Sequence, residues 1–216
     1  MDALIEAMRD RQGPRMAVAL DIDVTIADIY TPMIDELNKR NAAEGKPTEF
    51  TAADVTNYDW STVGSQWREG MDAIYNHMWN HRSEDITLHM DLLKLSALME
   101  HLHLEFVTTK DDDTTVEATK RWLIGHGLGD ITLNILYPGQ DRSEMDFRFY
   151  IDDNHGLVEK ITSKEGKVLF LVYHPTNSHI REDGAKIIRV PNVNHALTTL
   201  TNAARTLQKP RRIRGV

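Results

Sequence analysis

The stretch from Met16 to Thr25 constrains the fold more than any other part of this sequence. Its first half, Ala17-Val-Ala-Leu20, is a run of small and β-branched apolar residues, which is typical of a strand buried on both faces of a parallel sheet. Asp21 and Asp23 follow directly, two positions apart. Side chains alternate along extended backbone, so at a strand end where the chain turns both carboxylates can face one pocket.

Two carboxylates so close together need a chemical explanation. They repel each other, and one of them takes up a proton unless a cation lies between them. The pair therefore predicts either a hard divalent metal or a protonated acid, and a nucleophile beside a general acid/base uses both. The alternative is structural, because aspartate is also common at strand ends as a helix cap or turn residue.

The composition limits the classes of function. The chain has 216 residues, of which 41% are hydrophobic and 27% charged, as in a folded globular protein. A net charge of −8 disfavours binding to nucleic acid, although a metal would still allow a small phosphorylated substrate. The absence of cysteine excludes disulfides, thiolate metal sites and cysteine nucleophiles. With no signal-like start and no apolar run near about 18 residues, we expect a cytoplasmic protein that does not contact membranes.

A long, mostly helix-like interval follows Thr25. Thr31-Pro32 predicts the N-cap and first residue of a helix, and Thr51 to Asp54 predicts a capping box. The aromatic residues of this interval either form the core of a small domain or, in part, face a flat group such as a nucleobase; they are Tyr58, Trp60, Trp67, Tyr75 and Trp79. His77 and His81 have metal-ligand spacing, but they lack the glutamate of a zinc-protease motif, which favours a surface or core role.

The second half of the chain alternates strands and helices. Leu102 to Val107 predicts a strand that ends in Thr108-Thr109, where a hydroxyl can bind a phosphoryl oxygen without adding negative charge. Further strands are predicted at 131–136, 147–151, 168–173 and 187–190, with helices between them. This pattern predicts a doubly wound α/β sheet that binds its ligand at the carboxyl ends of the strands.

Another pair of acids, Asp152-Asp153, follows the strand predicted at 147–151. Together with Asp21 and Asp23 it would form a site made only of oxygen ligands, which suits Mg²⁺. The basic tail at 209–216 is more typical of a solvated terminus than of a nucleic-acid contact.

In this order the strand ends resemble three motifs of the haloacid dehalogenase (HAD) superfamily of phosphotransferases: motif I at Asp21-Ile-Asp23-Val-Thr25, motif II at Thr108 and motif IV at Asp152-Asp153. The resemblance implies a Rossmann-like core at 1–27 and 91–208, a helical C1 cap at 28–90 and a separate tail at 209–216. Within the superfamily the layout is most similar to the 5'(3')-deoxyribonucleotidases, including a Pro-x-Asn element at Pro175-Thr-Asn177.

The same resemblance implies a role for each matching residue. Asp21 would attack phosphorus and form an aspartyl-phosphate, and Asp23 would protonate the leaving oxygen and then activate water. Thr108 would hold the phosphoryl group, and Thr25 and Thr109 would assist in substrate binding. Mg²⁺ would lie on the Asp21 carboxylate, the Asp23 backbone carbonyl, and Asp152 and Asp153, with a slight preference for Asp153.

The sequence departs from the family at motif III, a lysine that balances the anionic nucleophile and the phosphate. No lysine stands shortly before Phe147. Lys120, on the helix after motif II, is the first candidate and Arg142 the second, although arginine changes the geometry.

Two functions follow from these patterns. The first is a Mg²⁺-dependent phosphomonoesterase acting on a nucleotide or another small phosphorylated metabolite, with Trp60 among the residues expected to stack on the substrate. The alternative is a HAD-fold protein with little or no turnover that serves as a binding or scaffold module. A homodimer is one of the oligomeric states compatible with either function.

Overall fold

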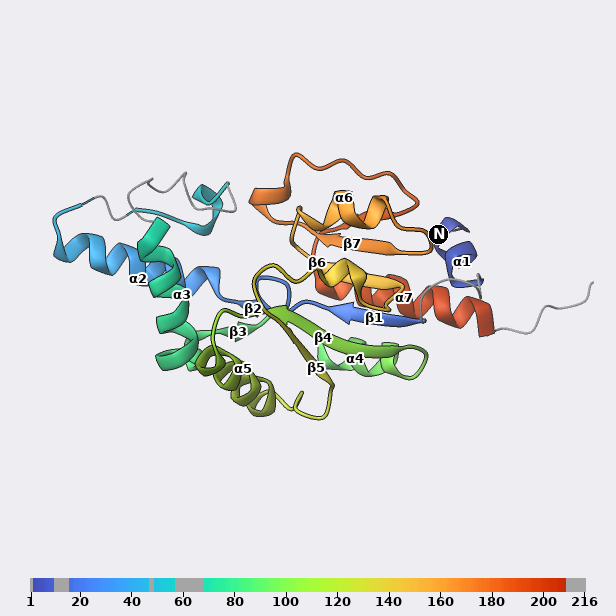
Figure 1. Cartoon of the computed structure of the whole chain (residues 1–216), viewed down its shortest axis with the longest axis horizontal. Coiled ribbons are helices and arrows are strands. Elements are labelled where there is room, and N and C mark those ends of the chain that lie inside the picture. Colours follow the sequence, from blue (N-terminus) through green and yellow to red (C-terminus); the bar gives the residue numbers. More distant parts are fainter. Residues whose placement is uncertain (1, 10–15, 47–48, 57–67, 209–216) are drawn as a thin grey trace, which may run out of the picture.

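A computed structural model describes residues 2–9, 16–46, 49–56 and 68–208 of this chain. Its centre is a six-stranded sheet in the order β5-β4-β1-β6-β7-β8, in which every neighbouring pair is parallel (Figure 1). The strands are β1 (Ala17–Leu20), β4 (His103–Thr109), β5 (Leu133–Leu136), β6 (Phe149–Asp152), β7 (Val168–Val172) and β8 (Ile187–Val190). The predicted doubly wound α/β sheet is confirmed.

The strand order places the polar strand ends side by side. β1 pairs with β4 on one edge and with β6 on the other, so the direction of winding reverses at β1. A ligand-binding crevice forms where the strand order reverses, at the carboxyl ends of the strands. Here those ends carry the predicted motif residues of β1, β4 and β6.

Strand residues alternate between two apolar layers. Val18 and Leu20 of β1 contribute to a core with α1 (Asp2–Arg9), α4 (Leu92–Met99) and α7 (Val193–Gln208). Ala17 and Ala19 face the other layer, which includes Leu157 and Ile161 of α6 (Leu157–Thr162). Because both faces are covered, β1 is apolar at every position, as its sequence predicts.

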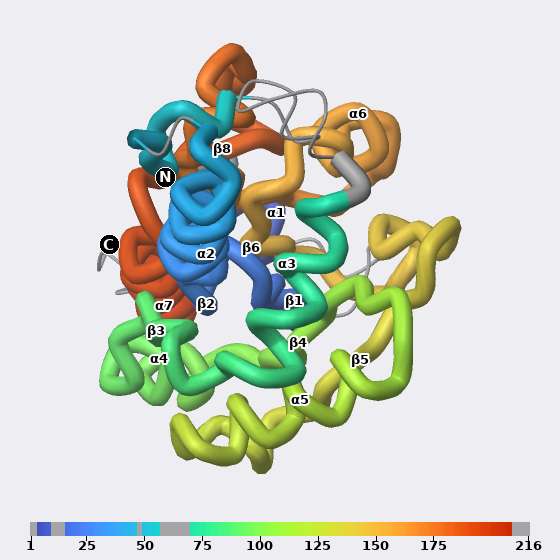
Figure 2. The backbone as a smooth tube through the Cα atoms, turned by 90° about the vertical axis from the view of Figure 1, so that its left-hand side faces the viewer, coloured from blue at the N-terminus to red at the C-terminus, as the bar shows by residue number. Residues whose placement is uncertain are grey.

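The interval between β1 and α4 contains α2 (Tyr30–Ala43), η1 (Ala52–Asp54), α3 (Arg68–His81) and η4 (Ser83–Asp85). Its two ends meet in an antiparallel pair, β2 (Ala27–Asp28) with β3 (Thr87–Leu88). Figures 1 and 2 show α2 and α3, which pack against each other, at the carboxyl end of the sheet. We call this interval the insert; the exact domain boundaries at 27/28 and 90/91 stay a prediction.

The sequence predicted one helix cap of the insert correctly and another wrongly. The capping box of Thr51 and Asp54 is confirmed. The prediction that Thr31 caps α2 is wrong, because the helix begins at Tyr30 and the side chain of Asp28 accepts the hydrogen bond from the Thr31 amide at 3.1 Å. The short strands β2 and β3 were not predicted, since each is too short to establish a period. No helix in the described part of the chain is long and apolar enough to cross a membrane.

The helix after β4, α5 (Asp113–Gly125), ends in a glycine-dependent turn. The Leu128 amide donates to the Leu123 carbonyl at 2.8 Å and the Gly127 amide to the Ile124 carbonyl at 3.0 Å, which is the Schellman pattern. Gly127 has φ +73, a left-handed conformation that a side chain disfavours.

We predict that Gly127→Ala lowers the free energy of unfolding by about 1 kcal/mol, the cost of placing a Cβ in left-handed backbone. Gly125→Ala is the matched control, because Gly125 is helical and the space that a Cβ would occupy there is open. It should be neutral or stabilising by about 0.5 kcal/mol. Urea unfolding of the two variants measures both effects, and equal effects would contradict this account of the helix end.

Candidate active site

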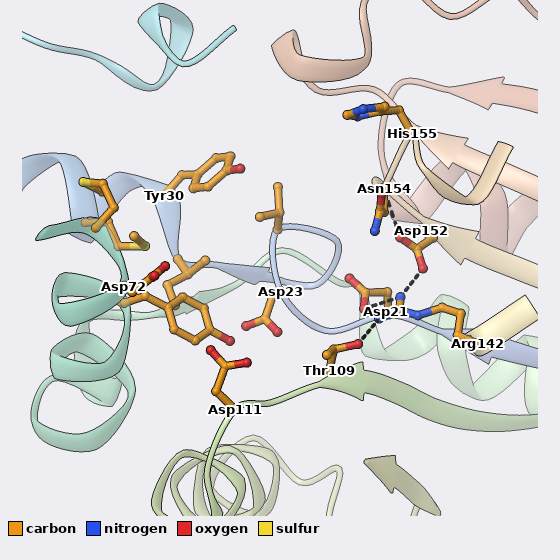
Figure 3. Close-up of a pocket in the computed structure, with 15 residues that line it drawn as sticks. Asp21, Asp23, Tyr30, Asp72, Thr109, Asp111, Arg142, Asp152, Asn154 and His155 are labelled. Atoms are coloured by element: carbon orange, nitrogen blue, oxygen red, sulfur yellow. Dashed lines mark hydrogen bonds and ion pairs between the residues drawn. The ribbon is translucent and has the colours of Figure 1, made fainter. Parts of the chain in front are cut away.

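A cavity of about 690 Å³ opens at the carboxyl ends of β1, β4 and β6 and extends to the inner sides of α2 and α3. Figure 3 shows Asp21, Asp23, Asp152 and Arg142 on the sheet side of this cavity and Tyr30 and Asp72 on the insert side. The residues that the strand ends carry therefore share one pocket with the insert.

A tight loop after β1 carries the second motif I carboxylate, Asp23. The amides of Ile26 and Ala27 both donate to the Ile22 carbonyl, at 3.0 and 2.9 Å, which folds the chain back on itself. Val24, in the middle of this loop, has φ 65, a conformation that is unfavourable for a β-branched residue. Strained backbone of this kind persists only where the surroundings enforce it, and it is concentrated at functional sites.

Asp21, Asp152 and Asp153 form a buried acidic triad. One carboxylate oxygen from each lies within 4.8 Å of those of the other two, and the three residues are at most 5% exposed. The Thr25 hydroxyl lies 3.2 Å from Asp21 Oδ2 and 3.5 Å from Asp153 Oδ1. Asn177, in the predicted Pro-x-Asn element, donates to the Asp153 carbonyl at 2.8 Å and so fixes the chain at this point.

The triad fits a hard divalent cation. Its ligand atoms are all carboxylate oxygens, which Mg²⁺ prefers. Asp153 Oδ2 is buried without a hydrogen-bond partner, an arrangement that is costly for a charged oxygen unless a cation or proton reaches it. The predicted metal ligands Asp21, Asp152 and Asp153 are thus brought together, and the predicted fourth ligand, the Asp23 backbone carbonyl, stays a prediction.

Arg142 is the cation that contacts the triad. It begins η5 (Arg142–Glu144), and its guanidinium donates to Asp21 Oδ1 at 2.7 Å and also to Asp152 Oδ2. The same guanidinium lies 3.5 Å from the Thr109 hydroxyl. Arg142, the second candidate for the motif III cation, therefore contacts the predicted nucleophile Asp21.

Burial and mutual repulsion control the charge of the triad. Burial, with further contributions from Asp152 and Asp23, raises the pKa of Asp21 to about 7 even though Arg142 opposes the shift. Burial, followed by the charges of Asp21 and Asp152, also raises the pKa of Asp153. Without a bound cation, the triad therefore holds protons at a pH where isolated carboxylates are ionised.

Asp23 is held by donors from β4 and α3. Thr108 donates to its Oδ2 at 2.9 Å, and the Trp79 indole donates to its Oδ1 at 3.0 Å. Lys110 Nζ lies 2.9 and 2.8 Å from the two oxygens. Thr108 is fully buried against Asp23, so the exposed strand-end hydroxyl that lines the cavity is that of Thr109.

Lys120, the first candidate for the motif III lysine, lies outside the site. Its side chain is half exposed on α5 and pairs with Glu117 at 2.7 Å. Among the described residues, the lysine that contacts Asp23 is Lys110, which stands only two positions beyond Thr108 and was not predicted as a site residue. Strand alternation, which points Thr108 and Lys110 to the same side, is the signal that identifies it.

The aromatic residues of the insert divide into two groups. Trp79 and Tyr75 reach Asp23 and Lys110. Trp60, Tyr58 and Trp67 lie outside the described residues, and the stacking role expected of Trp60 stays a prediction. The ring centroids of His77 and His81 lie 5.4 Å apart, with the two rings tilted against each other. The described residues supply no third metal ligand for this pair.

No protein-family model and no curated protein matches the chain, but solved structures match its fold. Mycobacterium tuberculosis Protein Tyrosine Kinase A aligns with a TM-score of 0.60 at 13% identity, covering 87% of this chain and 98% of that one. CbbY from Rhodobacter sphaeroides, solved with phosphate, aligns with 0.53 at 14% identity over 83% and 95%. A HAD-superfamily hydrolase from Ehrlichia chaffeensis aligns with 0.50 at 13% identity over 88% and 98%. The chain therefore shares the fold of HAD-superfamily hydrolases.

The raised pKa values predict how stability depends on pH in the presence of a chelator. A carboxyl group whose folded pKa exceeds its unfolded pKa stabilises the fold below the unfolded pKa, and this contribution is lost as the pH rises through the folded pKa. For Asp21 that window runs from about 4 to about 7. We expect the free energy of unfolding to fall as the pH rises from about 4 to about 7. Asp21→Asn should make this fall in the free energy of unfolding shallower and should stabilise the metal-free protein at pH 8. An equally steep fall in the variant would contradict the raised pKa of Asp21.

The triad also predicts a measurable response to Mg²⁺. At a Mg²⁺ concentration 100 times Kd, binding to the folded state alone stabilises it by about 2.7 kcal/mol. Thermal unfolding should show this gain in the native protein and lose it in Asp153→Asn. Asp111→Asn is the matched control, because Asp111 is an exposed carboxylate that lines the same cavity. A response that survives in Asp153→Asn would place the metal elsewhere.

Proposed function

We propose that this protein is a Mg²⁺-dependent phosphomonoesterase of the HAD superfamily that works through an aspartyl-phosphate on Asp21. The observation that carries the proposal is the grouping of Asp21 with Asp152 and Asp153, within 4.8 Å, beside the guanidinium of Arg142. A carboxylate in this position can attack phosphorus while neighbouring positive charge offsets the negative charge of the phosphate. The shared fold with HAD hydrolases supports the same reaction class.

The chain's own residues account for the steps of such a reaction. Asp21 forms a bond to phosphorus as the bond to the leaving oxygen breaks, and Asp23, which must enter this step protonated, gives that oxygen its proton. Asp23 then accepts a proton from the water that hydrolyses the aspartyl-phosphate, which returns both carboxylates to their starting state. Arg142 and the Thr109 hydroxyl are placed to hold the phosphoryl oxygens. Mg²⁺, held by Asp21, Asp152 and Asp153, would supply the remaining positive charge.

The cavity supports a small organic substrate. Its volume of about 690 Å³ lies within the range of small-molecule sites. Beyond the acidic side, the insert supplies apolar and aromatic surface from Ile29, Tyr30, Met33 and Met71. We propose a nucleotide, in particular a deoxyribonucleoside monophosphate, because its base offers a flat face to aromatic side chains and its phosphate fits the triad.

A second candidate is a HAD-fold binding module with little turnover. The observation in its favour is the pairing of Arg142 with both Asp21 and Asp152, since a guanidinium on two of the three carboxylates competes with a cation for the same oxygens. The two candidates differ in whether phosphate is released.

Phosphate release from a panel of phosphate monoesters, including deoxyribonucleoside monophosphates, with Mg²⁺ distinguishes the candidates. We expect turnover in the native protein and loss of turnover in excess chelator. Asp21→Asn should lower kcat by at least about 10³-fold, since the amide is nearly isosteric with the carboxylate but is not a nucleophile. Asp111→Asn, with an intact triad, is the control for altering an acid of the same cavity. Circular dichroism should show that Asp21→Asn is folded. Turnover retained in that variant would exclude the covalent mechanism, and an inactive native protein would favour the binding module.

A further inference from the structure

Lys110 is a fully buried cation that the proposed reaction has not yet used. It follows the last residue of β4, and its side chain has no exposed surface. Its ammonium group contacts Asp23 Oδ1, Asp23 Oδ2 and the Tyr75 hydroxyl, at 2.9, 2.8 and 2.7 Å. An ammonium group has three hydrogens, so these contacts account for all of its donors.

Aromatic rings of α3 enclose the same ammonium group. Lys110 Nζ lies 4.2 Å from the centroid of the Trp79 ring and 5.3 Å from that of Tyr75. Aromatic faces attract cations without adding a negative charge, so they stabilise the buried ammonium group. The insert and the sheet thus meet at this lysine.

The geometry leaves the Asp23 carboxylate little freedom. Each of its oxygens accepts a contact from Lys110, and one oxygen also accepts from Trp79 and the other from Thr108. Two of these donors come from the end of β4 and one from α3. A carboxylate held on both oxygens keeps one orientation relative to Asp21, as a proton-transfer group at fixed distance from a leaving oxygen requires.

Lys110 does not belong to the group that would hold the phosphate. It is absent from the lining of the cavity, whereas Asp23, Tyr75 and Arg142 line it. Arg142 contacts Asp21 and Asp152, and Lys110 contacts Asp23, so these two cations serve different carboxylates.

We infer that Lys110 is a positioning residue for proton transfer, which acts through Asp23 and is itself held by Tyr75 and Trp79 of the insert. This role rests on the proposed phosphomonoesterase function. It makes α3 a structural part of the catalytic apparatus, because two of its side chains fix the lysine that orients the acid/base. Substrate selection and proton transfer would then depend on the same helix.

A double-mutant cycle with two substrates tests the inference. Lys110→Met, Asp23→Asn and the double variant are assayed with Mg²⁺ on an aryl phosphate, whose leaving group departs without a proton, and on an alkyl phosphate, whose leaving group needs one. Tyr75→Phe removes a single contact to the lysine, and Lys39→Met, which alters an exposed lysine of α2, is the control. Thermal unfolding checks that each variant folds.

If Lys110 acts through Asp23, Lys110→Met should lower kcat by at least about 10-fold on the alkyl phosphate and by less on the aryl phosphate, with KM nearly unchanged. In the Asp23→Asn background the same change should cost less than about 2-fold, because residues that act as a unit are not additive. Tyr75→Phe should show a smaller loss in the same direction, which serves as the test should Lys110→Met not fold.

Several results would overturn the inference. Independent, multiplicative losses in the double variant would show that Lys110 does not act through Asp23. Equal losses on both substrates would indicate a structural role, and a higher KM with unchanged kcat would make Lys110 a substrate-binding residue. Each of these outcomes leaves the native protein active and so spares the proposed function, whereas a native protein inactive on every ester would reject the function and this role together.

Discussion

The mutual repulsion of three buried carboxylates is the interaction on which the rest of the site depends. Asp21, Asp152 and Asp153 gather their oxygens within 4.8 Å while almost excluded from solvent. Such a cluster is stable only with protons, a cation or both. The raised pKa values of Asp21 and Asp153 favour bound protons. The Arg142 guanidinium supplies one positive charge, and the Asp153 oxygen without a partner is available to a metal ion. Burying three carboxylates together costs folding free energy. The proposed binding of a divalent cation with a phosphate would explain why the fold retains the cluster.

The architecture explains how the carboxylates come together. Parallel strands with helices on both faces direct all their carboxyl ends to one edge, and the reversal of the strand order at β1 opens a crevice between β4 and β6. The strained loop around Val24 follows β1 and carries Asp23, and the two neighbouring acids have different partners. Asp21 joins the triad beside Arg142, and Asp23 joins Lys110, Thr108 and Trp79. Two aspartates with different partners are what a nucleophile and an acid/base require.

Sequence reasoning predicted the strand ends well because they depend on local pattern. Buried strands read as apolar runs, and the polar residues at the ends of β1, β4 and β6 meet at one edge in any parallel sheet. Sequence reasoning failed for contacts between side chains that are far apart in the sequence. Lys120 matched a family position but faces solvent beside Glu117, while Lys110 and Arg142 enter the site through the end of β4 and through η5. Likewise, no local signal linked Trp79 to Asp23, because their contact joins the insert to the sheet.

The central claim is that Asp21 is a nucleophile whose carboxylate shares a divalent cation with Asp152 and Asp153. A crystal structure of the protein grown with Mg²⁺ and beryllofluoride, which mimics a phosphoryl group bonded to a carboxylate, tests it without knowledge of the substrate. The account predicts beryllium bonded to an Asp21 oxygen and Mg²⁺ contacting all three acids, with Arg142 moved from Asp152 toward the fluorides. Beryllofluoride on a different carboxylate, or Mg²⁺ bound away from the triad, would contradict it.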